Sequence, residues 1–127
     1  MQPGEKKVFK KIVEKKDTAG FFEEMVHPVY STFSIARDAE WSGRLFVLEL
    51  REDFEEGIGT SITVNHHAPA FPGDEVIFTA TLKEINNHEI ITDYEARVDG
   101  KLIASGVQGQ KIFSREKLAH IFSRQKQ

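Results

Sequence analysis

A glutamate and a threonine at helical spacing are the first residues of this sequence whose types could do chemistry. Glu40 falls on a stripe whose other members are apolar or small: Val29, Phe33, Ala36, Gly43, Val47 and Leu50. Intervals of three and four predict an α-helix over residues 29–50 with this stripe turned inward. Thr32 precedes Glu40 by eight residues, about 80° round the axis, so both can lie on one side. Carboxylates are rarely buried unless paired or used, which makes Glu40 a candidate functional acid.

A histidine ends the next regular segment. Residues 58–66 alternate, with Ile58, Thr60, Ile62, Val64 and His66 on one face, as in a half-buried strand. His67 then points the opposite way. If the strand packs against the helix, His66 lies on the side that Glu40 faces. Taken alone, His66 also fits a histidine at the rim of the core.

Glu40 and Thr32 each have a reading without catalysis. Glu40 could pair with Arg37 or Arg44 at the helical spacings of three and four. In an apolar pocket, however, a carboxylate is a stronger base than in water. Ser31 or Thr32 could be the N-cap of the helix. A capping hydroxyl would still lie beside free N–H groups, where the helix dipole favours a developing oxyanion.

Gly59 is likewise open to two readings. It could be a loop glycine, or its missing side chain could let a substrate approach the backbone N–H. Other side chains are expected to be structural: Phe33, Trp41, Phe46 and Phe78 in the core, and the remaining histidines at the surface. No His and acid spacing suggests a metal site, and we expect none.

The remaining elements predict an α+β domain that spans residues 1–127. Residues 7–15 suggest a lysine-rich edge strand, and residues 21–28 a loop or short helix. Residues 75–85, 88–98 and 102–113 read as strands, joined by tight turns at Asn86–Asn87 and Asp99–Gly100. Ser114 opens a short C-terminal helix. Strands linked by hairpins form an antiparallel sheet, and the long helix is its natural cover.

Composition excludes several classes of function. Over 127 residues the formal net charge is −3, which favours neither nucleic acid nor an anionic membrane as partner. The sequence has no cysteine, so disulfides, thiolate metal sites and cysteine nucleophiles are excluded, and a cytoplasmic location is expected. The N-terminal stretch is too charged for a signal peptide, and no apolar run nears the ~18 residues of a membrane span.

The combined motifs resemble a known family. The run VYSTFSIARDAEW, followed by GTSITVNHHAPAFPGDEV and later by IASGVQGQKIF, is similar to the fluoroacetyl-CoA thioesterase-like branch of the hotdog superfamily. The resemblance implies an antiparallel sheet of about five strands wrapped around a long central helix. It also implies that Thr32, Glu40 and His66 are catalytic and that Gly59 contacts the substrate. The family often carries a histidine at Gln108, and the segment before the helix differs, so fluoroacetyl specificity is not implied.

The resemblance implies an acyl-CoA thioesterase, which hydrolyses a thioester to a carboxylic acid and free CoA, with CoA present only as part of the substrate. Phe22, Met25 and Phe33 are expected to line the acyl pocket. Sites would lie between the two subunits of a homodimer joined through their sheet edges. Glu40 and His66 would activate water or a covalent intermediate, His66 would protonate the thiolate, and Thr32 would position the thioester or act as nucleophile. A general-base route and a glutamyl-anhydride or acyl-threonine route both fit.

Two other functions remain open at this stage. One is a non-catalytic module on the same fold that binds acyl-CoA or an acyl-carrier protein. The other is a hotdog hydratase acting on enoyl-CoA, which we rank last because the threonine and glutamate pair on the helix resembles the thioesterase branch. Fold alone does not choose among them.

Overall fold

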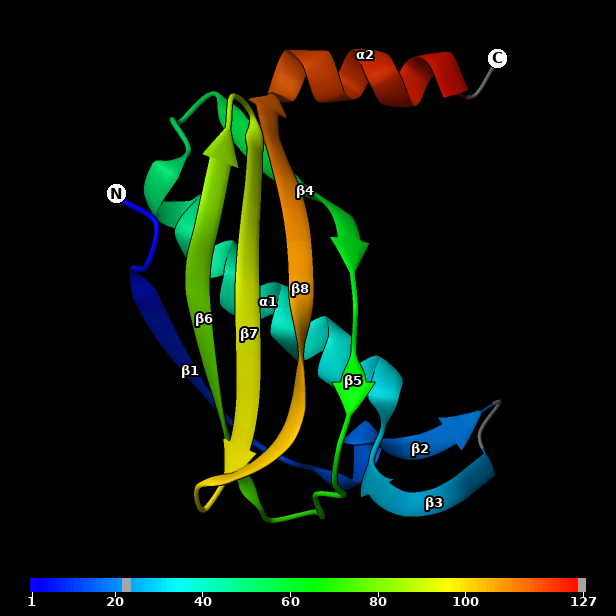
Figure 1. Ribbon diagram of the computed structural model, residues 1–127. Helices are drawn as coiled ribbons and strands as arrows, with labels where there is room; N and C mark the ends of the chain where they lie inside the picture. Colours follow the sequence, from blue (N-terminus) through cyan, green and yellow to red (C-terminus); the bar gives the residue numbers. More distant parts are fainter. Residues whose placement is uncertain (22–23, 126–127) are drawn as a thin grey trace.

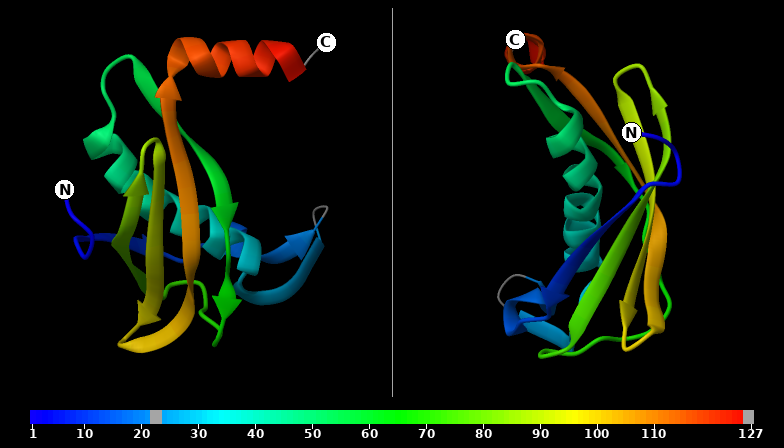
Figure 2. Two further views of the ribbon diagram at one scale, coloured as in Figure 1. Left: turned by 45° about the horizontal axis from the view of Figure 1, so that its top comes forward. Right: turned by 90° about the vertical axis from the view of Figure 1, so that its left-hand side faces the viewer.

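An antiparallel sheet packed on one long helix forms the body of the molecule, in a computed structural model that describes residues 1–21 and 24–125 (Figure 1). The helix, α1 (Thr32–Leu50), lies against one face of the sheet, as both views of Figure 2 show. The strands of the sheet follow the order β1 (Lys6–Ile12), β6 (Glu75–Asn86), β7 (Glu89–Val98), β8 (Lys101–Ser114) and β4 (Glu55–Ile62). The short β5 (Asn65–His66) pairs with β8 beyond the end of β4. The edges are therefore β1 on one side and β4 with β5 on the other.

The two long hairpins form where the turn residues predict them. Asn87, between β6 and β7, has φ 55°, and Asp99 and Gly100, between β7 and β8, have φ 47° and 79°. These left-handed conformations suit Asn, Asp and Gly, which is why such residues select tight hairpins. The predicted edge strand at the N-terminus is confirmed as β1. The predicted C-terminal helix is α2 (Arg115–Gln125), and the Ser114 hydroxyl accepts a hydrogen bond from Lys117 N at 3.0 Å.

The buried face of α1 overlaps the predicted apolar stripe only at Gly43 and Val47. Phe46 is buried as expected, but Phe33 is 48% exposed and Trp41 is 41% exposed. The helix is instead rotated so that another set of residues faces the sheet: Ser34, Ile35, Asp38, Ala39, Ser42, Gly43, Phe46 and Val47. Three of these are polar, and the sequence pattern alone counts polar residues as outward-facing. Glu40 consequently lies beside the buried face and is exposed.

Each buried polar residue of α1 has a partner that offsets its desolvation. Ser34 bonds the N-cap residue Ser31, whose Oγ accepts from Ser34 N at 3.0 Å. Asp38 accepts a hydrogen bond from the hydroxyl of Tyr30, and Ser42 donates to the carbonyl of Ala39 at 2.6 Å. These contacts make the rotated orientation of the helix favourable.

Two predicted segments differ in the structure. The loop or short helix predicted at residues 21–28 is wrong: β2 (Thr18–Phe21) and β3 (Glu24–Tyr30) pair as a separate hairpin, after a short 3₁₀ turn at Lys15–Asp17. Gly20 permits this pairing, because a Cβ there would lie 2.9 Å from the Glu24 carbonyl oxygen. The single strand predicted over residues 58–66 is two strands, β4 and β5, and β4 already begins at Glu55.

Candidate active site

Thr32 and His66 meet where α1 begins. Ser31 is the N-cap, so Thr32 is the first helical residue and not the cap that one reading of the sequence suggested. The Thr32 hydroxyl lies 3.1 Å from Nδ1 of His66. His66 is held on β5, opposite Ala104 of β8. The adjacent His67 contacts a different element, with its Nε2 2.8 Å from the Ser105 hydroxyl. Of the two histidines, His66 is thus the one directed to the helix.

Glu40 lies two turns further along α1, against β4. A side chain at Gly59 would collide with the Glu40 carboxylate, so the missing Cβ is what lets the acid rest on this strand. Arg37 and Arg44 pair with other carboxylates, at 2.9 Å from Asp17 and 2.9 Å from Glu56 respectively. The ion pairs that offered a purely structural role for Glu40 are therefore not the ones formed. Thr32, Glu40, Gly59 and His66 all lie along the seam between α1 and the strands β4 and β5.

An ionic network with two buried carboxylates supports the start of the helix, and sequence reasoning missed it. The Arg37 guanidinium bonds Asp38 at 3.0 Å and Asp17 at 2.9 Å, and Asp38 also accepts from Tyr30. The backbone adds to this clamp, because Ser31 N donates to the Asp17 carbonyl at 3.0 Å. Tyr30, which precedes the Ser31 cap, bonds Asp38 of α1, and Arg37, which follows the cap, bonds Asp17 of the 3₁₀ turn. The network thus fixes the place at which Thr32 enters the helix.

The network also sets the charge states of its members. Burial alone would raise the pKa of Asp17, but hydrogen bonds from Arg37 and the Glu14 N–H outweigh it and lower that pKa below its usual value. Burial, together with the bond to Asp38, raises the pKa of the Tyr30 hydroxyl. Bonds to Asp38 and Asp17 raise the pKa of Arg37. At neutral pH Asp17 is therefore a carboxylate, Arg37 a guanidinium and Tyr30 a neutral phenol.

The residues expected to contact an acyl group lie at the β2–β3 hairpin and the first turn of α1. Phe33 is exposed, and its ring centroid lies 5.5 Å from that of Phe21. Met25 is exposed on β3. Phe22 lies outside the described residues. Phe33, which directly follows Thr32 in the sequence, thus contacts the aromatic ring of Phe21 on the hairpin.

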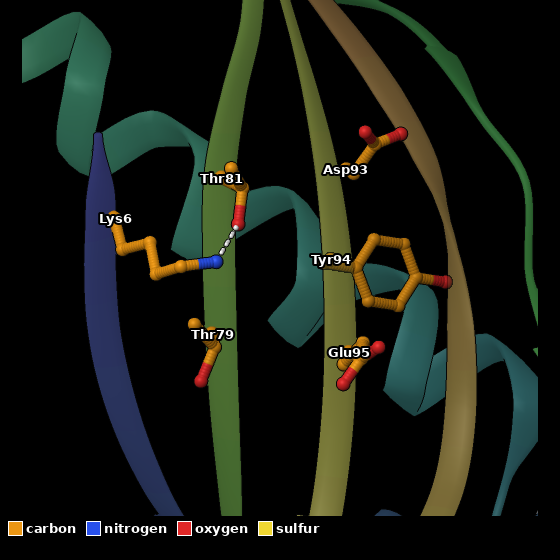
Figure 3. A pocket seen from close by; sticks show the side chains of 6 residues that line it. All are labelled: Lys6, Thr79, Thr81, Asp93, Tyr94 and Glu95. Carbon is orange, nitrogen blue, oxygen red and sulfur yellow. Dashed lines mark hydrogen bonds between the residues drawn. The ribbon is translucent and has the colours of Figure 1, made fainter. Parts of the chain in front are cut away.

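A surface hollow on the other face of the sheet contains none of these residues. It has a volume of about 280 Å³, and Figure 3 shows it with α1 behind the strands. Its lining consists of Lys6, Thr79, Thr81, Asp93, Tyr94 and Glu95. Lys6 donates to the Thr81 hydroxyl at 3.0 Å. Since the hollow lacks every predicted site residue, we place the candidate active site at the α1–β4–β5 seam instead.

Two further features concern metals and membranes. Residues 1–21 and 24–125 contain no group of three or more His, Asp or Glu side chains placed to hold a metal ion. Over the same described part of the chain, no helix combines the length and apolar character needed to cross a membrane.

The comparisons with known proteins show the family and the fold of this chain. The family model of fluoroacetyl-CoA-specific thioesterases matches residues 13–116, which include Thr32, Glu40, Gly59 and His66. The chain belongs to this family. No curated protein sequence gives a significant match. The predicted hotdog architecture is confirmed by the solved structures that resemble this chain.

Three solved structures illustrate the likeness. A hypothetical protein of Thermus thermophilus, described as a thioesterase superfamily member, is 33% identical with a TM-score of 0.94, covering 98% of this chain and 93% of its own. The fluoroacetyl-CoA thioesterase FlK is 26% identical with a TM-score of 0.89, covering 100% and 98%. A 1,4-dihydroxy-2-naphthoyl-CoA thioesterase from Synechocystis, at 13% identity and a TM-score of 0.70 over 87% and 84%, shares the fold.

Proposed function

We propose that this protein is an acyl-CoA thioesterase. The observation that carries the proposal is the contact between Thr32 and His66 beside Glu40 and Gly59, in a member of the fluoroacetyl-CoA-specific thioesterase family. In the reaction, water adds its oxygen to the acyl carbon and the carbon–sulfur bond breaks. The products are a carboxylic acid and the free thiol of CoA. A variant of FlK has been solved in complex with fluoroacetate and CoA, the product pair of such a hydrolysis.

The geometry supports a division of roles among three side chains. When the Thr32 hydroxyl donates to Nδ1 of His66, the ring proton of a neutral His66 is on Nε2. The departing thiolate is protonated by the imidazolium form of His66, whose Nδ1–H donates to the Thr32 hydroxyl. Loss of the Nε2 proton then leaves a neutral ring, and the proton that Glu40 takes from water replaces it. Glu40 takes the proton of the attacking water, or attacks the acyl carbon itself in the covalent route. Thr32 positions the thioester or is the nucleophile. Both routes remain compatible with these residues.

Gly59 and the hairpin supply the substrate contacts in this proposal. The side-chain-free strand at Gly59 allows the thioester carbonyl to approach the backbone, whose N–H stabilises the oxyanion. Phe33 and Met25, with Phe22 as a further prediction, contact the acyl group. Their exposed apolar surface beside the seam supports this assignment. We assign no preference for fluoroacetyl-CoA, because the segment before α1, which contains the hairpin, differs from the family motif.

The exposure of the site favours a homodimer. Thr32, Glu40 and His66 are all exposed in a single chain, yet acid–base catalysis is strongest where water is excluded. The strands beside them, β4 and β5, form an edge of the sheet. A second copy joined at this edge would extend the sheet and cover the seam, so that each site would include residues of both subunits. No cofactor is needed beyond the CoA of the substrate, and a cytoplasmic location stays a prediction.

Thiol release from a panel of acyl-CoAs tests the proposal. Short, branched, aromatic and long acyl chains are compared on the native chain, Glu40→Gln, His66→Ala and the control His67→Ala. We expect one acyl class to turn over, and Glu40→Gln and His66→Ala to lose at least about 100-fold in kcat, the usual scale of acid–base catalysis. His67→Ala removes an adjacent histidine that bonds Ser105 and should keep native activity.

Calorimetric titration with the same acyl-CoAs separates the alternatives. Tight binding without turnover would make the chain a binding module. Turnover that persists in both Glu40→Gln and His66→Ala would support the thioesterase activity but refute this location of the active site. Turnover lost only in those two variants, with circular dichroism unchanged, supports the assignment.

A further inference from the structure

A chain of buried polar side chains crosses the core beneath α1. It starts at Thr92 on β7, whose hydroxyl accepts a hydrogen bond from Nε2 of Gln108 on β8. Gln108 Oε1 in turn accepts from Nε2 of Gln110 at 2.9 Å. All three side chains are buried, and Thr92 and Gln108 have no exposed surface at all. Burying amides costs stability unless every group is bonded, so such a chain calls for an explanation.

The chain ends at Glu40. Gln110 Nε2 donates to the main-chain carbonyl of Glu40 at 3.1 Å, across 70 residues of sequence. Gln110 is also the register partner of Gly59 in the β4–β8 pair. Directly opposite residues of an antiparallel pair direct their side chains to the same face. Glu40 is therefore held from two adjacent strands: its carbonyl by Gln110 on β8, and its carboxylate against Gly59 on β4.

The helix is adapted to this chain at Gly43. A Cβ at position 43 would collide with the side-chain amide of Gln108, so glycine is required where the amide passes. Glycine is unfavourable inside a helix, and two glutamines are unfavourable in a core. Apolar residues with an alanine at position 43 would form a simpler core. The protein nevertheless has a helix glycine and two buried glutamines next to Glu40, and this arrangement points to a function beyond packing.

We propose that Gln110 is a positioning residue for Glu40. This inference rests on the proposed thioesterase function. The hydrogen bond to the Glu40 carbonyl fixes the rotation and height of α1 relative to β4, and these set where the carboxylate lies over Gly59. Misplacing a catalytic group by about 1 Å can cost as much as 100-fold in rate. Gln110 itself contacts no reacting atom in this proposal.

Gln110→Met is the direct test, because methionine has a similar length and no donor. Its control is Thr92→Val, which removes the other end of the same buried chain without touching α1. We expect Gln110→Met to lower kcat about tenfold with KM changed less than about twofold, while Thr92→Val keeps native kcat. Thermal unfolding is recorded for both, so that a loss of stability is measured separately. If Gln110→Met does not fold, Gln110→Asn, whose amide is too short to reach Glu40, takes its place.

A double-mutant cycle with Glu40→Gln distinguishes positioning from general damage. If Gln110 acts through the carboxylate, Gln110→Met should have almost no further effect on the residual rate of Glu40→Gln. An equal tenfold loss in both backgrounds, a native kcat for Gln110→Met, or an equal loss for Thr92→Val would each overturn the inference. An active native chain that depends on Glu40 but not on Gln110 refutes only this inference. A native chain without activity refutes the proposed function and this inference with it.

Discussion

Adding one methyl group at Gly59 should separate activity from stability. In Gly59→Ala the new Cβ would overlap the Glu40 carboxylate, while the backbone at Gly59 is outside the left-handed region and accepts alanine. The obstructing group is the free end of an exposed, flexible side chain, so it can move aside without disturbing the core. We therefore expect the protein to fold normally with Glu40 displaced from its native position.

The magnitudes follow from those two facts. Replacing a glycine by alanine at a compatible backbone position changes the free energy of unfolding by at most about 1 kcal/mol, in the stabilising direction. A displacement of the carboxylate by about 1 Å costs about 100-fold in kcat, because reacting groups must be closely aligned. That loss equals about 2.7 kcal/mol of barrier, at about 1.36 kcal/mol per factor of ten.

Gly57→Ala provides the matched control on the same strand. There the added Cβ would lie 2.6 Å from Cγ1 of Val47, a fully buried side chain that has little room to move. Overpacking of this kind costs about 1–3 kcal/mol of stability. Urea unfolding and thiol release on both variants should show opposite patterns, with Gly59→Ala stable and inactive and Gly57→Ala less stable and active. Native kcat in Gly59→Ala would show that the Glu40 position over Gly59 is irrelevant to turnover.

Two further predictions concern acid stability and assembly. Asp17 has a native pKa below its unfolded value near 3.9, so its carboxylate stabilises the fold above about pH 4 and loses that contribution as the pH falls through its native pKa. Urea unfolding of Asp17→Asn should show a loss of about 2 kcal/mol at pH 7 that shrinks on acidification, and a pH-independent difference would contradict this reasoning. Ile62→Lys, at a position 38% exposed on the β4 edge, should reduce the sedimentation coefficient and the specific activity together. Ile85→Lys, at a position 40% exposed in the distant β6–β7 hairpin, should leave both unchanged, and a dimeric Ile62→Lys would exclude β4 as the interface.

Local patterns in the sequence were sufficient for much of the fold. The alternation of β6, β7 and β8 and the turn residues between them depend on neighbouring residues only, and these elements are confirmed with boundaries shifted by one residue. The Ser31 cap and the Ser114 cap are equally local. The spacing of Thr32, Glu40 and His66 could also be read directly, and their resemblance to a thioesterase family is confirmed. Their catalytic roles stay predictions.

The rotation of α1 was decided only by the tertiary structure. The apolar stripe predicted Phe33 as an inward residue, whereas Asp38 and Ser42 face the core. Buried polar side chains are stable only where a partner is present, and the partner of Asp38 is a network that includes Asp17 from another element. A periodicity analysis has no access to such contacts. It therefore placed Glu40 within the inward face rather than at its margin.

The same physical reason applies to the hairpin and to the support of Glu40. The pairing of β2 with β3 depends on backbone contacts that Gly20 permits. The sequence of these strands has no apolar alternation that would predict the pairing. Gln110 reaches Glu40 across 70 residues, and Gly43 leaves the space that the neighbouring Gln108 amide occupies. Sequence alone thus determined which residues could perform the chemistry. Packing and hydrogen bonding between distant segments decided which surface those residues face and what holds them there.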